Sequence, residues 1–301
     1  MEIPHDGSTC LEAEKNVKAS GDFPDPVPVS TGEWKYLYGR AFGVEGVMDR
    51  NHRQLFADVG TDLAAIAPEA IIDLGCGNGR FSLAVSARAS TPTISLLLDK
   101  DRDLLSTAVA GHLANGSRAW PLLADVDFLP FPETLEIRRP AVLLSHVLYY
   151  SRSWPYLLSR VLRMIEHSNG CCVIVTRTRR SDSYRLRRAV RSAQNQENAA
   201  MVQSEVVAEW LTDHDVPFLS RMTRTDLPVP LPHGSEAALR DLLFQDSELR
   251  GLLALVCHQD PCTMDVSSFT ALARSLAPGP EGGTLLSFEN EALIAWPGSV
   301  T

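Results

Sequence analysis

Residues 70–80 read AIIDLGCGNGR, in which a short apolar run containing one acid is followed directly by three glycines spaced by one residue. An apolar run of this length is typical of a buried strand, and the glycines indicate a tight turn with backbone conformations open mainly to glycine. Such a turn can bind phosphates or another ligand that approaches the backbone closely, or it can be a turn and nothing more. Features outside this stretch have to separate these possibilities.

Downstream of the turn, apolar runs alternate with stretches of helical periodicity. The further runs that we predict to be strands are TISLLLD at 93–99, AWPLLAD at 119–125, the start of PAVLLSHVLYY at 140–150, and CCVIVTR at 171–177. Apolar strands separated by helices are typical of a parallel sheet that is buried on both faces and has helical crossovers. The sequence therefore predicts an α/β fold with a doubly wound, mainly parallel sheet.

The pattern changes on both sides of this core, which we place at residues 70–225. Before the core we predict a flexible tail at residues 1–30 and a helical lid at 31–69. After the core we predict a helical insertion on the substrate side at 226–283 and a final strand hairpin at 284–301. In the last unit, two short strand-like runs flank the polar residues FENE at 288–291. We expect this hairpin to complete the sheet.

The composition narrows the class of partner. The chain has 301 residues and a net charge of −9, which argues against a general affinity for nucleic acids or anionic membranes. No apolar run approaches the ~20 residues of a membrane span, and the first residues lack the features of a signal peptide, so we expect a cytoplasmic protein. The six cysteines do not show the spacing of a zinc site, and we expect no bound metal.

Residues 177–191, RTRRSDSYRLRRAVR, contain seven arginines in 15 positions. Such a cluster can bind the phosphates of a nucleic acid, but its amphipathic spacing is also that of a helix with one solvated face. Together with the net negative charge, this makes nucleic acid an unlikely partner. An anionic small molecule or a partner protein stays open, and the sequence does not indicate the oligomeric state.

The spacing of the glycines argues against two common nucleotide-binding loops. The phosphate-binding loop of nucleoside triphosphatases requires a lysine after its last glycine, and none follows Gly79. In a dinucleotide-binding loop the third glycine falls one residue later than it does here. Gly75, Gly77 and Gly79 suit S-adenosylmethionine, because side chains at these positions would block the approach of its amino-acid end.

Three acids lie at the carboxyl ends of predicted strands, where open α/β sheets bind their ligands. Asp73 is placed to hold the ammonium group of S-adenosylmethionine, and Asp99 to accept hydrogen bonds from both ribose hydroxyls. Asp125 and its neighbour Val126 are placed to contact the adenine. This pattern supports S-adenosylmethionine as the cofactor.

Each acid has an alternative role. Asp73 could cap the loop that follows it, and Asp99 could cap the next helix in competition with Asp101. Asp127 could contact the adenine in place of Asp125.

These features together resemble the class I S-adenosylmethionine-dependent methyltransferases. The resemblance covers about residues 45–225 and rests on DLGCGNG at 73–79, on Asp99 and on ADVD at 124–127. It implies a Rossmann-like, seven-stranded sheet with helices on both faces. It also implies transfer of a methyl group from S-adenosylmethionine, with S-adenosylhomocysteine as the product.

A narrower resemblance points to the histamine N-methyltransferase group. SHVLYY at 145–150 is similar to the double-tyrosine turn that follows the fourth strand in that group, and Phe288 with Asn290 is similar to its closing hairpin. The resemblance implies that Glu45 presents its carboxylate to a substrate amine. The glycine loop departs from that group, so its substrate is not carried over.

The residues after the predicted fourth strand lie where cofactor and acceptor meet. We expect Ser145 to contact the cofactor, and His146 to be a general base, a cofactor contact or a histidine satisfied by local backbone groups. Tyr149 and Tyr150 could form an aromatic wall against the substrate or the cationic sulfur, or one of them could pack in the core.

We therefore expect a small-molecule methyltransferase, with N-methylation of an amine, imidazole or nitrogen heterocycle favoured, in the biosynthesis of specialised metabolites. His146, Tyr149 and Glu45 are the candidate catalytic residues, and Glu45, Tyr150 and Asn290 the candidate substrate contacts. Glu45 could instead be a solvated helix residue, and Asn290 a turn residue. The alternative functions are O- or C-methylation, a cyclisation promoted by the sulfonium charge, and binding without catalysis.

Overall fold

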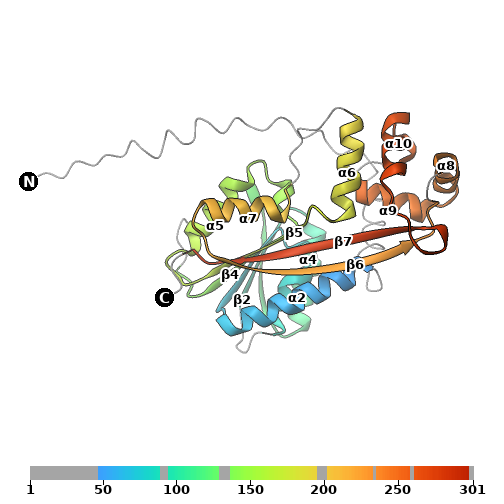
Figure 1. Cartoon of the computed structure of the whole chain (residues 1–301). Coiled ribbons are helices and arrows are strands. Elements are labelled where there is room, and N and C mark those ends of the chain that lie inside the picture. The colour runs from blue at the N-terminus through green and yellow to red at the C-terminus, as the bar shows by residue number, and fades with distance from the viewer. Residues whose placement is uncertain are drawn as a thin grey trace, which may run out of the picture.

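Seven strands form one sheet in the computed structural model, which describes residues 47–88, 94–128, 136–194, 202–232, 235–257 and 261–297. Within these residues the order of the sheet is β3-β2-β1-β4-β5-β7-β6 (Figure 1). The predicted tail and Glu45 lie outside the described residues. The strands are β1 (Ala70–Leu74), β2 (Ile94–Asp99), β3 (Arg118–Leu123), β4 (Pro140–Ser145), β5 (Cys171–Arg177), β6 (Phe218–Val229) and β7 (Thr284–Ala295).

The strands from β1 to β5 run parallel, and β7 lies antiparallel between β5 and β6. Every residue of β1 is buried, which explains why this strand reads as a short apolar run. The chain passes from β1 through β2 to β3 on one side and then crosses to β4, so the predicted doubly wound α/β fold is confirmed. The reversal between β1 and β4 places the ligand crevice at their carboxyl ends.

Helices cover both faces of this sheet. The helices are α2 (Val47–Ile66), α3 (Arg80–Ser86), α4 (Arg102–Ala114), α5 (Trp154–Ile165), α6 (Asp182–Ala193), α7 (Ser204–Asp213), α8 (Glu236–Gln245), α9 (Ser247–Cys257) and α10 (Val266–Ser275). Helices α2 and α3 pack against one face of the sheet and α5 and α7 against the other (Figure 1). None of the helices within the described ranges has both the length and the apolar character that a membrane crossing requires.

Strands β6 and β7 form a long antiparallel ribbon that runs from the pair Phe218↔Ala295 to the pair Val229↔Thr284. Strand β5 pairs with only the carboxyl-terminal half of β7, so the other half of the ribbon extends beyond the parallel strands. There it meets α8, α9 and α10, which form a second apolar core together with α6 (Figure 1).

This ribbon corrects two predictions. The expected pair of short strands within 284–301 is wrong, because β7 is one continuous strand whose hairpin partner is β6. Strand β6 also continues to Val229, past the boundary predicted at residue 225. The polar residues of FENE fit inside the strand because they find partners there: the hydroxyl of Thr178 donates to Glu289 at 2.7 Å.

Candidate active site

The glycine loop between β1 and α3 has the left-handed backbone that its sequence predicts, with φ values of 73° at Gly75, 53° at Gly77 and 75° at Gly79. A Cβ atom at Gly75 would lie 2.6 Å from a methyl group of Val147, and one at Gly79 would lie 2.7 Å from Cβ of Ala108. At Gly77, no atom of the described residues would lie within 4 Å. The first and third glycines therefore serve close packing, while the second faces open space at the end of the sheet.

Asp99 connects this loop to the end of β2. Its Oδ2 accepts a hydrogen bond from the amide of Gly77 at 2.8 Å, and its Oδ1 accepts one from the amide of Asp101 at 2.8 Å. Asp101, in turn, accepts from the amides of Asp103 and Leu104 and is the N-cap of α4. Asp101 thus takes the capping role, and Asp99 keeps lone pairs for a further donor.

Asp73, in the middle of the parallel sheet, is a buried acid without a hydrogen-bond partner among the described residues. Its side chain belongs to a residue that is 1% exposed, and neither carboxylate oxygen makes a hydrogen bond. Burial is the largest cause that raises its pKa to about 7, and the nearby charge of Asp99 acts in the same direction. Ser82 partly offsets this shift in pKa, although its hydroxyl donates to the carbonyl of Gly79 and makes no hydrogen bond to the carboxylate.

The two acids after β3 have different surroundings. Asp127 accepts from the hydroxyl of Ser151 at 2.6 Å and from the amide of Arg152 at 3.1 Å, so it ties the 3₁₀ turn η2 (Val126–Phe128) to the loop after β4. Asp125 accepts from the amide of Asp127 at 3.1 Å, and its side chain is 39% exposed. Val126 is buried and lines a pocket of about 220 Å³ between η2 and the start of α5.

Three side chains form a chain of hydrogen bonds beyond the end of β4, which we call the His–Tyr chain. Nε2 of His146 lies 2.9 Å from Nε2 of His52, and Nδ1 of His146 is hydrogen-bonded to the hydroxyl of Tyr149. His146 has a φ of 55°, a left-handed conformation that a residue other than glycine keeps only where its surroundings hold it. Both ring nitrogens of His146 are thus engaged by side chains, and local backbone groups satisfy neither.

Both histidines of the His–Tyr chain are neutral at physiological pH. Burial is the largest cause that lowers the pKa of His52 to about 3, and the positive charges of Arg177 and Arg80 contribute to this shift. Burial also lowers the pKa of His146 well below its usual value, as do His52 and Arg177. In a neutral chain, when Tyr149 donates to Nδ1 of His146, Nε2 of His146 carries a proton and donates to His52.

The remaining predicted substrate residues lie in two places. Tyr150 packs edge-to-face on Tyr149 with ring centroids 5.5 Å apart, and it is 65% exposed. Asn290 is 4% exposed and lies within β7 opposite Arg177 of β5, so the alternative of a turn residue is wrong. Ser145 ends β4 directly before His146.

Two residues of this region, His52 and Arg187, were not among the predicted site residues. His52 lies one helical turn before Phe56 and stacks on it at 5.4 Å, so a polar residue within the apolar stripe of α2 was the available signal. Arg187 lies on the buried side of α6 next to Leu186. It shares the buried side of α6 with Leu186 and Val190, which distinguishes it from the exposed arginines of segment 177–191, but the prediction treated the arginines of the segment as one solvated face.

Comparisons with known proteins bear on the fold. No protein-family model matches the chain, and no curated protein sequence matches it. A protein of Bacillus halodurans C-125, provisionally described as a methyltransferase, matches with a TM-score of 0.52 and 12% identity over 81% of this chain and 99% of that chain. The YcgJ protein of Bacillus subtilis matches with a TM-score of 0.47 and 11% identity over the same shares.

A third structure is the magnesium protoporphyrin IX methyltransferase of Synechocystis PCC 6803, solved with bound S-adenosylmethionine. It matches with a TM-score of 0.45 and 18% identity over 65% of this chain and 86% of that chain. At these identities the likeness concerns the fold, and the Bacillus halodurans structure is the one that carries it. The narrower resemblance to the histamine N-methyltransferase group stays a prediction. The chain thus has the Rossmann-like fold of the class I S-adenosylmethionine-dependent methyltransferases.

Proposed function

We propose that this chain is an S-adenosylmethionine-dependent methyltransferase that methylates a nitrogen atom of a small molecule. The observation that carries the proposal is the juxtaposition of three features at the carboxyl ends of β1, β2 and β4: an open glycine loop, the buried carboxylate of Asp73 with the nearby Asp99, and a neutral His–Tyr chain. The glycine loop and the acids fit the cofactor, and the His–Tyr chain fits the acceptor.

The residues around the loop fit S-adenosylmethionine. Asp73 is a buried carboxylate without a partner, and an ammonium group would satisfy it. The free space at Gly77 admits the amino-acid end of the cofactor, and Asp99, whose orientation the loop fixes, retains acceptor sites for the ribose hydroxyls. Asp125 and Val126 are the proposed adenine contacts, because Asp127 is already engaged by the loop after β4. When bound, S-adenosylmethionine supplies an electrophilic methyl group on its sulfonium.

The electrostatics at the end of β4 suit a nitrogen nucleophile. An amine attacks only when it is unprotonated. The burial and the arginine charges that lower the pKa of His52 and His146 would also lower the pKa of an amine bound beside them. The site would thus hold the acceptor as a neutral amine or imidazole at physiological pH.

The His–Tyr chain offers a path for a proton. A primary or secondary amine, or an imidazole N–H, must lose one proton after methylation. The oxygen of Tyr149 can accept it while its own proton passes to Nδ1 of His146, and the proton on Nε2 of His146 passes to His52. Because the pKa of His52 is about 3, the proton does not stay there and is released to solvent. His146 would act through Tyr149, as a positioning and relay residue.

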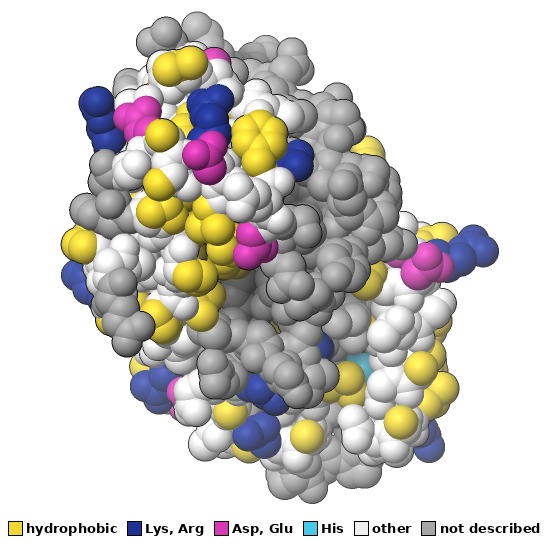
Figure 2. Space-filling view, turned by 90° about the vertical axis from the view of Figure 1, so that its right-hand side faces the viewer, with side chains coloured by type: hydrophobic (Ala, Val, Ile, Leu, Met, Phe, Trp, Pro, Cys, Tyr) yellow, Lys and Arg dark blue, Asp and Glu magenta, His cyan; other side chains and the backbone are white. Residues whose placement is uncertain are grey.

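The arrangement of charged side chains on one described face, and the contacts of two arginines, do not favour a nucleic-acid acceptor. On the face that Figure 2 shows, basic side chains are scattered among acidic and hydrophobic ones and do not form a continuous patch. Several arginines of segment 177–191 have protein partners: Arg179 donates to Gln203, and Arg185 pairs with Asp182. A small-molecule acceptor is therefore the proposal.

Calorimetry with S-adenosylmethionine and S-adenosylhomocysteine tests the cofactor half of the proposal. Both should bind, and Asp99→Ala should weaken binding by about a hundredfold, because it removes the ribose acceptor and frees the amide of Gly77. Asp103→Asn, on the exposed first turn of α4, is the matched control and should bind as the wild type does. If the wild type binds neither compound, the proposed function is wrong.

A labelled-methyl screen over amines, imidazoles, phenols and carbon acids tests the acceptor half. On a secondary amine or an imidazole, Tyr149→Phe should lower kcat by about ten- to a hundredfold. On a tertiary amine, which loses no proton on methylation, the same variant should keep nearly the wild-type kcat. Equal losses on both acceptors would assign Tyr149 to packing, and transfer to phenols alone would exclude N-methylation.

A further inference from the structure

Arg187 is a buried cation with an unused edge. The residue is 6% exposed, and its Nε and Nη2 atoms have no hydrogen-bond partner in the part of the chain that the structure describes. These two nitrogens form one edge of the guanidinium group, with two N–H bonds that point in nearly parallel directions. Burying an arginine without a partner is costly, so native proteins rarely leave such a group unpaired. The unpaired edge of Arg187 therefore requires an explanation.

The surroundings of Arg187 increase this cost. Its pKa is lowered to about 9, first by burial and then by the positive charges of Arg177 and Arg191. Tyr149 and Cys257 act in the opposite direction, and no carboxylate is among the groups that shift its pKa. Within the described residues, the guanidinium of Arg187 thus lies beside the tyrosine that ends the His–Tyr chain, and no carboxylate is seen to compensate its charge.

Another arginine of the same chain shows what this edge binds. Arg221 of β6 uses its Nε and Nη2 to hold both oxygens of Asp62 of α2, at 2.7 and 2.9 Å. Arg187 has the same two atoms free, in a place shielded from solvent. A planar group with two oxygens at the spacing of a carboxylate would satisfy both atoms.

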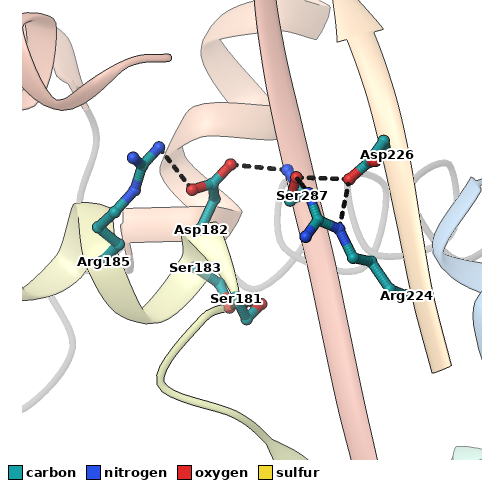
Figure 3. A network of polar contacts seen from close by, with 7 residues as sticks. All are labelled: Ser181, Asp182, Ser183, Arg185, Arg224, Asp226 and Ser287. Carbon is teal, nitrogen blue, oxygen red and sulfur yellow. Dashed lines mark hydrogen bonds and ion pairs between the residues drawn. The ribbon is translucent and has the colours of Figure 1, made fainter. Parts of the chain in front are cut away.

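The position of Arg187 is fixed by the polar network at the start of α6 (Figure 3). Asp182 accepts from the amide of Ser287 in β7 at 2.6 Å and pairs with Arg185 at 2.6 Å. The hydroxyl of Ser287 donates to Asp226 of β6, which also accepts from Arg224. The first turn of α6 is thereby tied to both strands of the ribbon. The buried arginine one turn later is held on a rigid support, as a binding residue should be.

We propose that the methyl acceptor carries a carboxylate group and that Arg187 binds this carboxylate through Nε and Nη2. This inference rests on the proposed function and specifies its substrate class. The carboxylate would supply the missing counter-ion, and the nearness of Tyr149 to Arg187 would bring the nitrogen of the same small molecule to the His–Tyr chain. The acceptor is thus an amino acid or a related nitrogen-containing acid.

Thermal shift measurements with matched compounds test the carboxylate directly, without turnover. The probes are histidine and histamine, tryptophan and tryptamine, and benzoate and benzamide, each added to the full-length protein saturated with S-adenosylhomocysteine. The acids should raise Tm by about 2 °C or more at millimolar concentration, and their partners without a carboxylate should not. The acids should lose this effect in Arg187→Met and keep it in Arg188→Met, which alters the exposed neighbour on α6.

The ligand-free variants provide a second readout. Arg187→Met should raise Tm by about 2–4 °C, because it replaces an uncompensated buried charge by an apolar side chain of similar length. Arg187→Lys keeps the charge but lacks the planar edge, so it should show neither the rise in Tm nor the response to acids. A fall in Tm of Arg187→Met would mean that Arg187 has a structural partner, and would overturn the inference.

The outcomes separate this inference from the proposed function. If the protein binds S-adenosylhomocysteine but no acid raises its Tm, or if acids and amines act equally, the carboxylate site is wrong while the methyltransferase proposal stands. If acids act through Arg187 but S-adenosylhomocysteine does not bind, the proposed function is wrong and an anion site remains. A larger shift with inorganic phosphate or phenyl phosphate than with benzoate would also overturn the carboxylate assignment.

Discussion

The ribbon of β6 and β7 differs from the carboxyl edge of the parallel strands in whether charged side chains have partners. Along the ribbon, Arg221 pairs with Asp62, and the buried Asp182 has two donors. At the carboxyl edge, Asp73 and Arg187 are also buried, yet within the described part of the chain both carboxylate oxygens of Asp73 and the Nε and Nη2 atoms of Arg187 lack partners. The difference teaches that this fold can satisfy the charges that it buries. Where it leaves a buried charged group without a partner, a ligand can supply that partner.

The largest effect on stability should come from removing a buried charged group that has partners. Asp182→Ala removes the buried carboxylate that accepts from the partly buried Ser287 amide and pairs with Arg185, and it should lower the free energy of unfolding by about 3 kcal/mol. Chemical denaturation measures this loss. The control Asp182→Asn keeps one oxygen acceptor and should lose about 1 kcal/mol. If the alanine variant were as stable as the wild type, the contacts of Asp182 would not stabilise the fold, and the contrast with Asp73 and Arg187 would be wrong.

The next effect concerns the unsatisfied acid and has the opposite sign. The pKa of Asp73 is raised to about 7 in the folded protein from an ordinary value of 3.8, so folded Asp73 holds its proton in a range where the unfolded chain has lost it. Its contribution to stability is therefore full below pH 3.8 and is lost as the pH rises towards 7. Asp73→Asn has no such loss, and its stability relative to the wild type should increase by about 2 kcal/mol from pH 5 to pH 8.

Chemical denaturation of both proteins at the two pH values measures this change, and the contributions of the histidines cancel in the difference. Saturating S-adenosylmethionine should reduce the advantage of Asp73→Asn at pH 8, because the proposed ammonium contact compensates the charge of the wild type. An advantage that is independent of pH would mean that Asp73 is not a buried, titrating acid.

The smallest effect should come from unpairing an arginine at the surface. Asp62→Asn leaves Arg221 without its carboxylate, as Arg187 is now, but the side chain of Arg221 is 42% exposed. Water can replace the lost partner, so Tm should fall by no more than about 2 °C in a thermal melt. If Tm fell in Asp62→Asn by more than it changes in Arg187→Met, an exposed ion pair would matter more for stability than an unpaired buried arginine. The contrast drawn above would then be wrong.

Much of the fold could be predicted because the parallel strands are buried on both faces. Such strands read as apolar runs, and β1, β4 and β5 were visible for this reason. Strand β7 was divided wrongly at FENE, because Glu289 and Asn290 look like turn residues in isolation. Their partners come from distant parts of the sequence, as the hydrogen bond from Thr178 to Glu289 shows, and no local pattern reveals such a pairing.

The predictability of the site follows the same division. Asp73, Asp99 and Asp125 could be placed because strand ends converge at one edge of a parallel sheet. Whether Asp99 or Asp101 caps α4 depended on which side chain reaches the helix amides, and the structure shows that it is Asp101. His52 could not be assigned to the site, because its contact with His146 joins residues that are 94 positions apart.

The register of the ribbon has a consequence for how such a chain can change over generations. Because β6 ends at Val229 directly opposite the first residue of β7, Thr284, the two ends of the helical segment between them emerge side by side. A segment with adjacent ends can lengthen, shorten or be exchanged while the register of the sheet stays the same, and longer closures add only slowly to the entropic cost. Grafting a different helical segment between Val229 and Thr284 would leave the glycine loop, Asp73 and Asp99 untouched. The ribbon thus makes this helical segment a replaceable part of an unchanged scaffold.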